Sequence, residues 1–246
     1  MADRTPPLVT ILAALILGGG FAIGAYFIAD GLVNLRSYDN YVTVKGVAER
    51  DVEADLVIWP IKHAATGDDL PTVQKEVEAS SQKVISFLRS QGIEANDIVT
   101  RSIEVTDLLA QQYRPDNATT SRFIVSETLT VRSTNIDSID KASQNIGDLL
   151  KQGVSLSRDS SNPGLPQYLY TKLNDLKPQM IADATKNARE SAAQFAKDSG
   201  ANVGTIRDAN QGLFEIQPRD SSDPYAERSS RYKTVRVVAT LKFYLD

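Results

Sequence analysis

The chain contains no cysteine and only one histidine, His63. Without cysteine it has no disulfide, no thiolate metal ligand and no cysteine nucleophile. A catalytic triad or a zinc site built on histidine would depend on His63 alone, whereas zinc normally takes several His or Cys ligands. His63 lies within residues 52–65, a run that is apolar on both faces, so we expect a packed or hydrogen-bonded structural histidine.

Other chemical signatures are also missing. The formal net charge is -4, and no Lys/Arg cluster favours a nucleic-acid partner. Gly18, Gly19 and Gly20 lack the following Lys-Ser/Thr of a phosphate loop, and no Gly-x-Ser-x-Gly elbow occurs. The alternating Asp51, Glu53 and Asp55 share one strand face without the spacing of a calcium loop, so we expect a solvated face. We therefore predict a non-enzymatic protein with no catalytic, cofactor-binding or metal-binding residues.

A long apolar segment is present at residues 8–29, and it contains no charged side chain. About 20 apolar residues span a bilayer as a helix, so this segment is predicted to be a transmembrane anchor. A cleaved signal peptide is the alternative, although its apolar core is usually shorter. The positive charges on the two sides of the segment are nearly balanced, so they do not set its orientation in the membrane. An N-terminal anchor followed by one long domain usually exports that domain, so we expect the C-terminal part outside the cytoplasm. Gly20 and Gly24 form a GxxxG pair that could bring two such helices together.

Strand and helix patterns alternate through the rest of the chain. A hairpin is predicted from residues 41–47 and 52–65 around a turn at 48–51, and another from 98–108 and 122–132. Helical periodicity predicts helices at 72–90, 135–151 and 175–199. Shorter strands are expected at 154–157, 168–172 and 202–209, and a two-faced strand at 235–245. This order predicts an α+β fold: antiparallel sheets with three helices in repeated ββα units, plus one N-terminal transmembrane helix.

The predicted organisation has four parts: an N-terminal tail at 1–7, the transmembrane anchor at 8–29, a juxtamembrane connector at 30–40 and an α+β domain at 41–246. Within that domain Glu127 interrupts an otherwise apolar strand face. Three roles are open for it: an ion pair with Arg101, an ion pair with Arg132, or a place at an oligomer interface.

Several short motifs recur in the order seen in one known family. They are Val42-Thr43-Val44-Lys45-Gly46, then Glu53-Ala54-Asp55-Leu56, then Gly92-Ile93 with Asp97-Ile98-Val99-Thr100, and finally the alanine-rich stretch from Ala182 to Gly204. Together they resemble the SIMPL domain family over about residues 41–245. Ala54 stands where that family usually has proline.

This resemblance implies a protein of the bacterial envelope, related to periplasmic immunogenic proteins that form ring- or channel-like homo-oligomers, with a suggested link to envelope or oxidative stress. It supplies no catalytic residues. We therefore expect a single-pass inner-membrane protein with its soluble domain in the periplasm, bound to the lipid bilayer through residues 8–29. The alternative is an anchored adaptor that captures an envelope protein or a small ligand through loops 111–121, 158–167 and 218–230.

Overall fold

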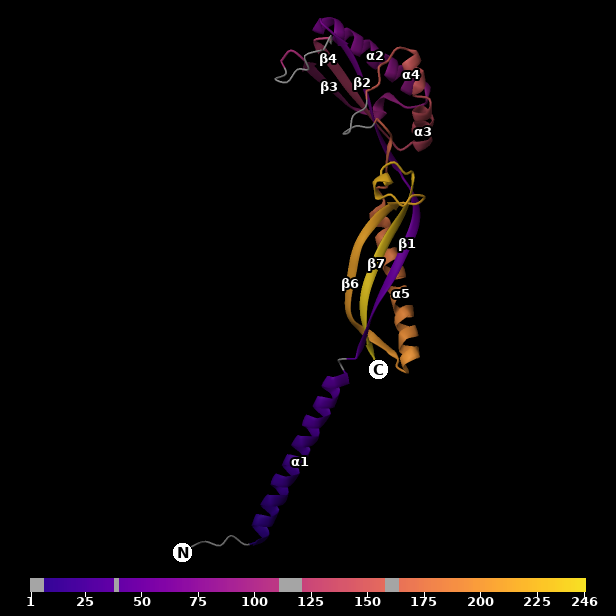
Figure 1. The fold of residues 1–246 in the computed structure, drawn as a ribbon. Coiled ribbons are helices and arrows are strands. Elements are labelled where there is room, and N and C mark those ends of the chain that lie inside the picture. The colour runs from indigo at the N-terminus through magenta and orange to yellow at the C-terminus, as the bar shows by residue number, and fades with distance from the viewer. Residues whose placement is uncertain (1–6, 38–39, 111–120, 158–163) are drawn as a thin grey trace. The chain divides into compact units, whose positions relative to one another are not determined.

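The computed structural model describes the chain except for residues 1–6, 38–39, 111–120 and 158–163 (Figure 1). It divides into two compact units. Unit 1 comprises Met1–Ala48, Gln179–Phe214 and Val237–Asp246, and unit 2 comprises Glu49–Pro178 and Glu215–Arg236. The α+β class is confirmed, with antiparallel pairing in both sheets, and the described residues form five α-helices rather than the predicted four.

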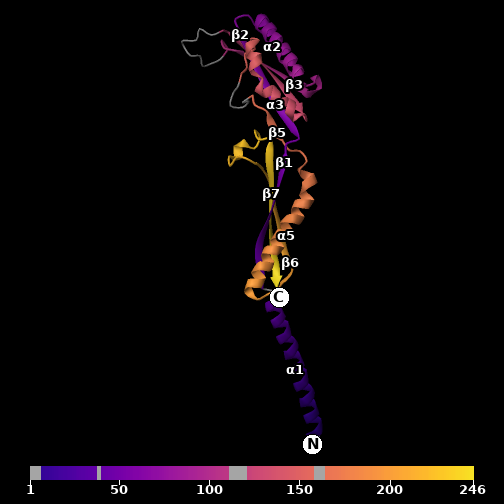
Figure 2. The same cartoon turned by 90° about the vertical axis from the view of Figure 1, so that its right-hand side faces the viewer.

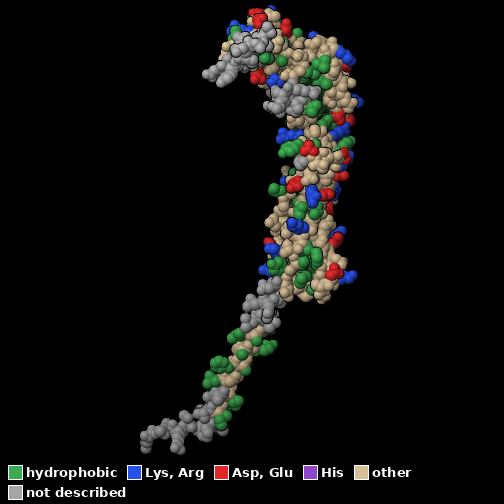
Figure 3. All heavy atoms as spheres, viewed as in Figure 1, with side chains coloured by type: hydrophobic (Ala, Val, Ile, Leu, Met, Phe, Trp, Pro, Cys, Tyr) green, Lys and Arg blue, Asp and Glu red, His purple; other side chains and the backbone are tan. Residues whose placement is uncertain are grey.

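Helix α1, Pro7–Ser37, covers the predicted anchor and continues through most of the predicted connector, because no proline interrupts residues 30–37. Many of its large apolar side chains are exposed, as Figure 3 shows for the described part of the helix. Within the parts of the chain that the structure describes, no helix is long and apolar enough to cross a membrane. The transmembrane helix predicted at 8–29 is therefore not supported; the side chains of residues 8–10, 13 and 14 lie outside this description.

The first sheet has the strand order β1-β7-β6, formed by β1 (Tyr41–Glu53), β7 (Tyr232–Leu245) and β6 (Val203–Pro218). Helix α5, Leu173–Ser199, lies along one of its faces (Figures 1 and 2). In unit 1 the helix buries a stripe of small side chains at a spacing of four residues, and β7 buries alternate residues. The buried residues are Ala184, Ala188, Ala192 and Ala196 on α5, and Val237, Ala239, Leu241 and Phe243 on β7.

Gly46 of β1 explains why the helix stripe consists of alanines. A Cβ atom at this position would lie 1.9 Å from the Ala184 carbonyl oxygen and 2.6 Å from the Ala188 amide nitrogen. The strand backbone therefore lies directly against the helix backbone, which requires glycine on the strand and favours small side chains such as alanine on the helix. The last residue of the Val-x-Val-x-Gly motif is thus a packing requirement of unit 1.

The second sheet lies in unit 2 and has the order β3-β4-β2-β5. Its strands are β2 (Leu56–Gly67), β3 (Ile98–Asp107), β4 (Phe123–Ser133) and β5 (Gln167–Leu169), and every pair is antiparallel. Helix α2, Leu70–Ser90, packs against β2 and β4. Asp69 caps its N-terminus, because the Asp69 carboxylate accepts a hydrogen bond from the Thr72 amide. Gly92, with a φ of +82°, follows its C-terminal end. The predicted helix at 72–90 and the predicted β3–β4 hairpin are confirmed.

The predictions for residues 41–65 and for the helix at 135–151 are wrong. Residues 48–51 are not a turn, because β1 runs through them and ends at Glu53. Ala54 and Asp55 separate it from β2. Consequently β1 and β2 do not form a hairpin but belong to different sheets, so the repeated ββα units are not observed. The predicted helix at 135–151 is divided into α3 (Ile136–Gln144) and α4 (Gly147–Lys151), because Asn145 caps α3 with non-helical backbone angles.

Candidate functional site

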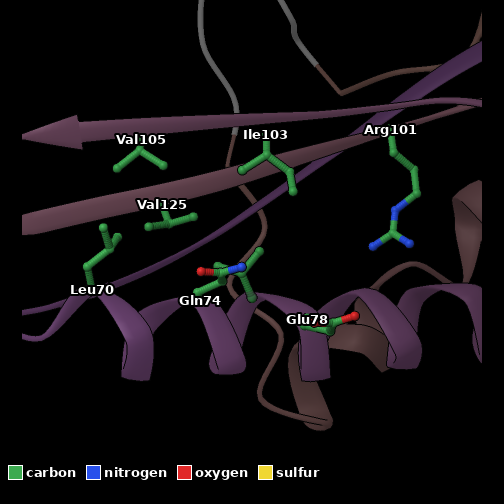
Figure 4. A pocket seen from close by; sticks show the side chains of 8 residues that line it. Leu70, Gln74, Glu78, Arg101, Ile103, Val105 and Val125 are labelled. Carbon is green, nitrogen blue, oxygen red and sulfur yellow. The ribbon is translucent and has the colours of Figure 1, made fainter.

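An apolar groove lies in unit 2 between helix α2 and the first two strands of the second sheet (Figure 4). Helical spacing places four α2 side chains along one wall, and alternate residues of β3 form the other. The groove encloses about 210 Å³. Its lining residues are Leu70, Gln74, Val77 and Glu78 from α2, Arg101, Ile103 and Val105 from β3, and Val125 from β4.

The groove opens along the edge of the sheet, because β3 is the outermost strand. Ile103 is 59% exposed and Val105 is 51% exposed, although both side chains are on the face that α2 partly covers. Their neighbour on β4, Val125, is buried. The alternation of residues 98–108 indicated this apolar face, but nothing in the sequence indicated that it would end at a strand edge.

One end of the groove is polar and reaches into the core. The Arg101 Nε donates to Glu127 Oε1 at 2.6 Å, and its Nη2 lies 3.2 Å from the Ser81 hydroxyl oxygen on α2. Glu127 is 1% exposed, so Arg101 neutralises a carboxylate that water hardly reaches. The hydrogen bond to Glu127 raises the pKa of the Arg101 guanidinium. Of the three roles open for Glu127, the ion pair with Arg101 is confirmed.

His63 lies on the far side of the same carboxylate. Register places it opposite Glu127 on the neighbouring strand, and its Nε2 lies 3.6 Å from Glu127 Oε2. The ring is fully buried, as a structural histidine would be, but neither ring nitrogen makes a hydrogen bond within the described residues. Burial lowers the pKa of His63, although the Glu127 carboxylate opposes this effect.

A measurable pH dependence follows from His63. Because burial lowers the pKa of His63 in the folded chain, the unfolded chain binds more protons on this residue than the folded chain does as the pH falls below about 6.5. Stability should therefore fall with falling pH, by up to about 1.4 kcal/mol per pH unit. Urea unfolding at several pH values between 5 and 7.5 should show this loss in the wild type and not in His63→Gln. Since His63 is the only histidine, equal slopes for the two proteins would contradict the assignment.

The other sequence candidates lie elsewhere. Asp51 accepts from the Thr234 hydroxyl, and Asp55 accepts from the Thr171 amide and hydroxyl. Glu53 accepts from Arg231 at 2.6 Å. The three carboxylates thus bind three different partners. Across the described part of the chain, no group of three or more His, Asp or Glu is placed to hold a metal ion.

Sequence reasoning missed the role of Arg231. Besides Glu53, its guanidinium contacts Asp137 and Asp140 of α3 at 2.8 Å each. The Tyr168 hydroxyl donates to Asp140, which adds β5 to the same cluster. One arginine therefore joins the end of β1 to α3, and the sequence separation of these residues left no local signal for it.

The predicted binding loops are only partly described. Most of loop 111–121 and part of loop 158–167 lie outside the described residues. Loop 218–230 contains a short 3₁₀ turn, Pro224–Ala226, and is held by Lys233, whose buried ammonium donates to the Glu227 carboxylate at 2.7 Å. Tyr225 in this turn is almost fully exposed.

Comparisons with known proteins place this fold in a family. No curated protein matches the chain. A solved structure titled a hydrolase from Listeria innocua is 12% identical and covers 80% of this chain and 91% of its own. Its TM-score of 0.22 is too low to support an argument about fold or activity. The SIMPL family, described as a protein of unknown function (DUF541), matches residues 42–243. The chain therefore belongs to the SIMPL family.

Proposed function

We propose that this protein is a non-enzymatic assembly domain of the bacterial envelope, which forms homo-oligomers through exposed strand edges. The observation that carries the proposal is the apolar groove at the β3 edge. Ile103 and Val105 are more than half exposed there, beside a cavity of about 210 Å³. Exposed apolar patches next to an open strand edge are typical of protein-binding surfaces.

The polar end of the groove also fits binding better than catalysis. Arg101 is engaged by the buried Glu127, and His63 is enclosed with no solvent access. A general base must reach the proton that it removes. The enclosed His63 and the engaged Glu127 do not meet this condition, whereas a rigid polar anchor under an apolar groove can position a bound segment.

Helix α1 is the second element of the proposal. Residues 8–29 contain no charged side chain, and Leu15, Phe21 and Phe27 are largely exposed. Burying such surface in lipid is favourable by roughly 25 cal/mol per Å² of apolar area. We include a lipid bilayer as the partner of this segment, which would hold the domain on the periplasmic side of the inner membrane. An oligomer would then carry several such segments and gain membrane affinity by avidity.

Light scattering after size exclusion in mild detergent tests the assembly. The wild-type chain should form particles with more than one copy at micromolar concentration. Ile103→Lys should reduce the number of copies, because a charge would enter the groove edge. Leu150→Lys is the matched control, since Leu150 is 58% exposed on α4 and should leave the particle unchanged. A wild-type protein that is monomeric at every concentration would exclude the proposed function.

A further inference from the structure

On its open side, β3 presents backbone amides and carbonyls that could pair with another strand. The Leu108 amide donates to the Arg122 carbonyl across the β3–β4 hairpin at 2.8 Å. Backbone groups alternate sides along a strand, so the even-numbered residues of this register direct their amides and carbonyls toward β4. Arg101, Ile103 and Val105 direct theirs to the open side. Among the described residues, no strand pairs with β3 on that side.

Over most of its length this edge is protected only by charge, through Arg101, Glu104 and Asp107. Proteins block open edges with charged side chains, prolines, bulges, short strands or covering segments. The opposite edge strand, β5, is short, with only three residues. In β3 the pairing register shifts between Ile98 and Thr100, but from Arg101 to Asp107 it is regular and free of proline. An added strand would continue the sheet and cover the exposed halves of Ile103 and Val105.

We infer that the occupant of this edge is β3 of a second copy, paired antiparallel about a two-fold axis perpendicular to the sheet. The inference rests on the proposed function and names the interface for it. Such an axis keeps each side chain on the same face, so residues that lie opposite must both be odd-numbered or both even-numbered. The axis must therefore pass between the two copies of one β3 residue, after which we name the axis.

Charge and strand overlap together restrict the register to two possibilities. An axis at Arg101 would place that residue opposite its own copy, and an axis at Glu104 would do the same for the carboxylate. Like charges directly opposite destabilise a strand pair. An axis at Ser102 or at Ile103 places neither Arg101 nor Glu104 opposite its own copy. In both registers Arg101 and Glu104 each face an uncharged residue. These are also the registers with the greatest overlap of Ile98–Asp107 with itself.

The apolar faces match in both of these registers. With the axis at Ser102, Val105 lies opposite Val99 and Ile103 lies opposite Arg101. With the axis at Ile103, this residue meets its own copy and Val105 lies opposite Arg101. The aliphatic part of the Arg101 side chain can cover an apolar neighbour while its guanidinium stays with Glu127. The apolar residues of the second β3 therefore lie beside those of the first, on the face of the sheet that forms the groove.

Single cysteines test the pairing cleanly, because the natural chain has none. Opposite residues of an antiparallel pair have Cα atoms about 4.5–5.5 Å apart, within disulfide reach. A residue one position from the axis is offset from its own copy by two residues, about 7 Å along the strand, and is out of reach. Mild oxidation of the full chain in detergent should therefore give a disulfide-linked dimer for either Ser102→Cys or Ile103→Cys, and not for both.

Two control variants make the outcome decisive. Glu104→Cys lies on the same strand but off either axis, and Leu213→Cys lies on β6, where Leu213 is 86% exposed. Neither should cross-link faster than random collision allows. Equal cross-linking of all four variants, or none in any, would overturn the inference. If light scattering still shows multimers in that case, the proposed function stands and another surface forms the interface. A monomeric wild-type protein would exclude both the β3 interface and the proposed function.

Discussion

Replacing Gly46 with alanine should destabilise the protein by about 3 kcal/mol or more, since inserting atoms into a packed core typically costs about 1–3 kcal/mol. The upper end applies here because the new Cβ would lie 1.9 Å from the Ala184 carbonyl oxygen and 2.6 Å from the Ala188 amide nitrogen. Both of these are backbone atoms, so no side-chain rotation relieves the contact. The strand and the helix would have to separate. Urea unfolding followed by circular dichroism should report the loss.

Gly147→Ala is the matched control for this substitution. A Cβ atom at Gly147 meets nothing within 4 Å, and the residue begins α4. Alanine is preferred over glycine inside helices by up to about 1 kcal/mol, so this variant should be as stable as the wild type or slightly more stable. If Gly46→Ala and Gly147→Ala unfold at the same urea concentration, the close contact between β1 and α5 is wrong.

Removing the guanidinium of Arg101 should have the second largest effect. Arg101→Met would leave the Glu127 carboxylate buried beside the His63 ring, which lies 3.6 Å away and whose lowered pKa keeps it uncharged at neutral pH. Breaking a buried ion pair by deleting one partner costs about 3–5 kcal/mol. Because the Arg101 side chain is 45% exposed, we expect a value near the low end, about 3 kcal/mol. Urea unfolding at neutral pH is the measurement.

A second substitution should restore most of this stability. In Arg101→Met with Glu127→Gln, the buried group no longer carries a charge, so the double variant should be more stable than Arg101→Met alone. Arg122→Met is the control for losing any arginine, since its pair with Asp107 is solvent-exposed and such pairs contribute little to stability. A double variant no more stable than Arg101→Met would show that the lost packing of Arg101, and not the buried charge, caused the effect.

These two sites differ in how far the sequence indicated them. Gly46 belonged to a recognisable motif, but the motif did not say what the glycine contacts. Glu127 stood out as the one charged residue on an apolar strand face, and Arg101 was among its expected partners. His63 was expected to be structural, yet its position opposite Glu127 depends on the pairing of β2 with β4. That pairing joins residues about 64 positions apart (127 − 63), beyond the reach of a local pattern.

The errors in the predicted fold have a common cause. Residues 48–51 look like a turn because Glu49, Arg50 and Asp51 are charged, but in β1 these positions continue the alternation of a strand. The partner that makes this possible is β7, near the other end of the chain. Local propensity favoured a turn, and pairing between distant strands overrode it.

The α+β class, helix α2, the β3–β4 hairpin and the apolar character of residues 8–29 could all be predicted from the sequence, because each depends on the pattern of a short segment. Three features became visible only in the folded chain: which strands share a sheet, the position of β3 at an edge, and the contacts among Arg101, Glu127 and His63. These features depend on strand order and register, which are set by contacts between residues far apart in the chain and leave no periodic trace in any one segment.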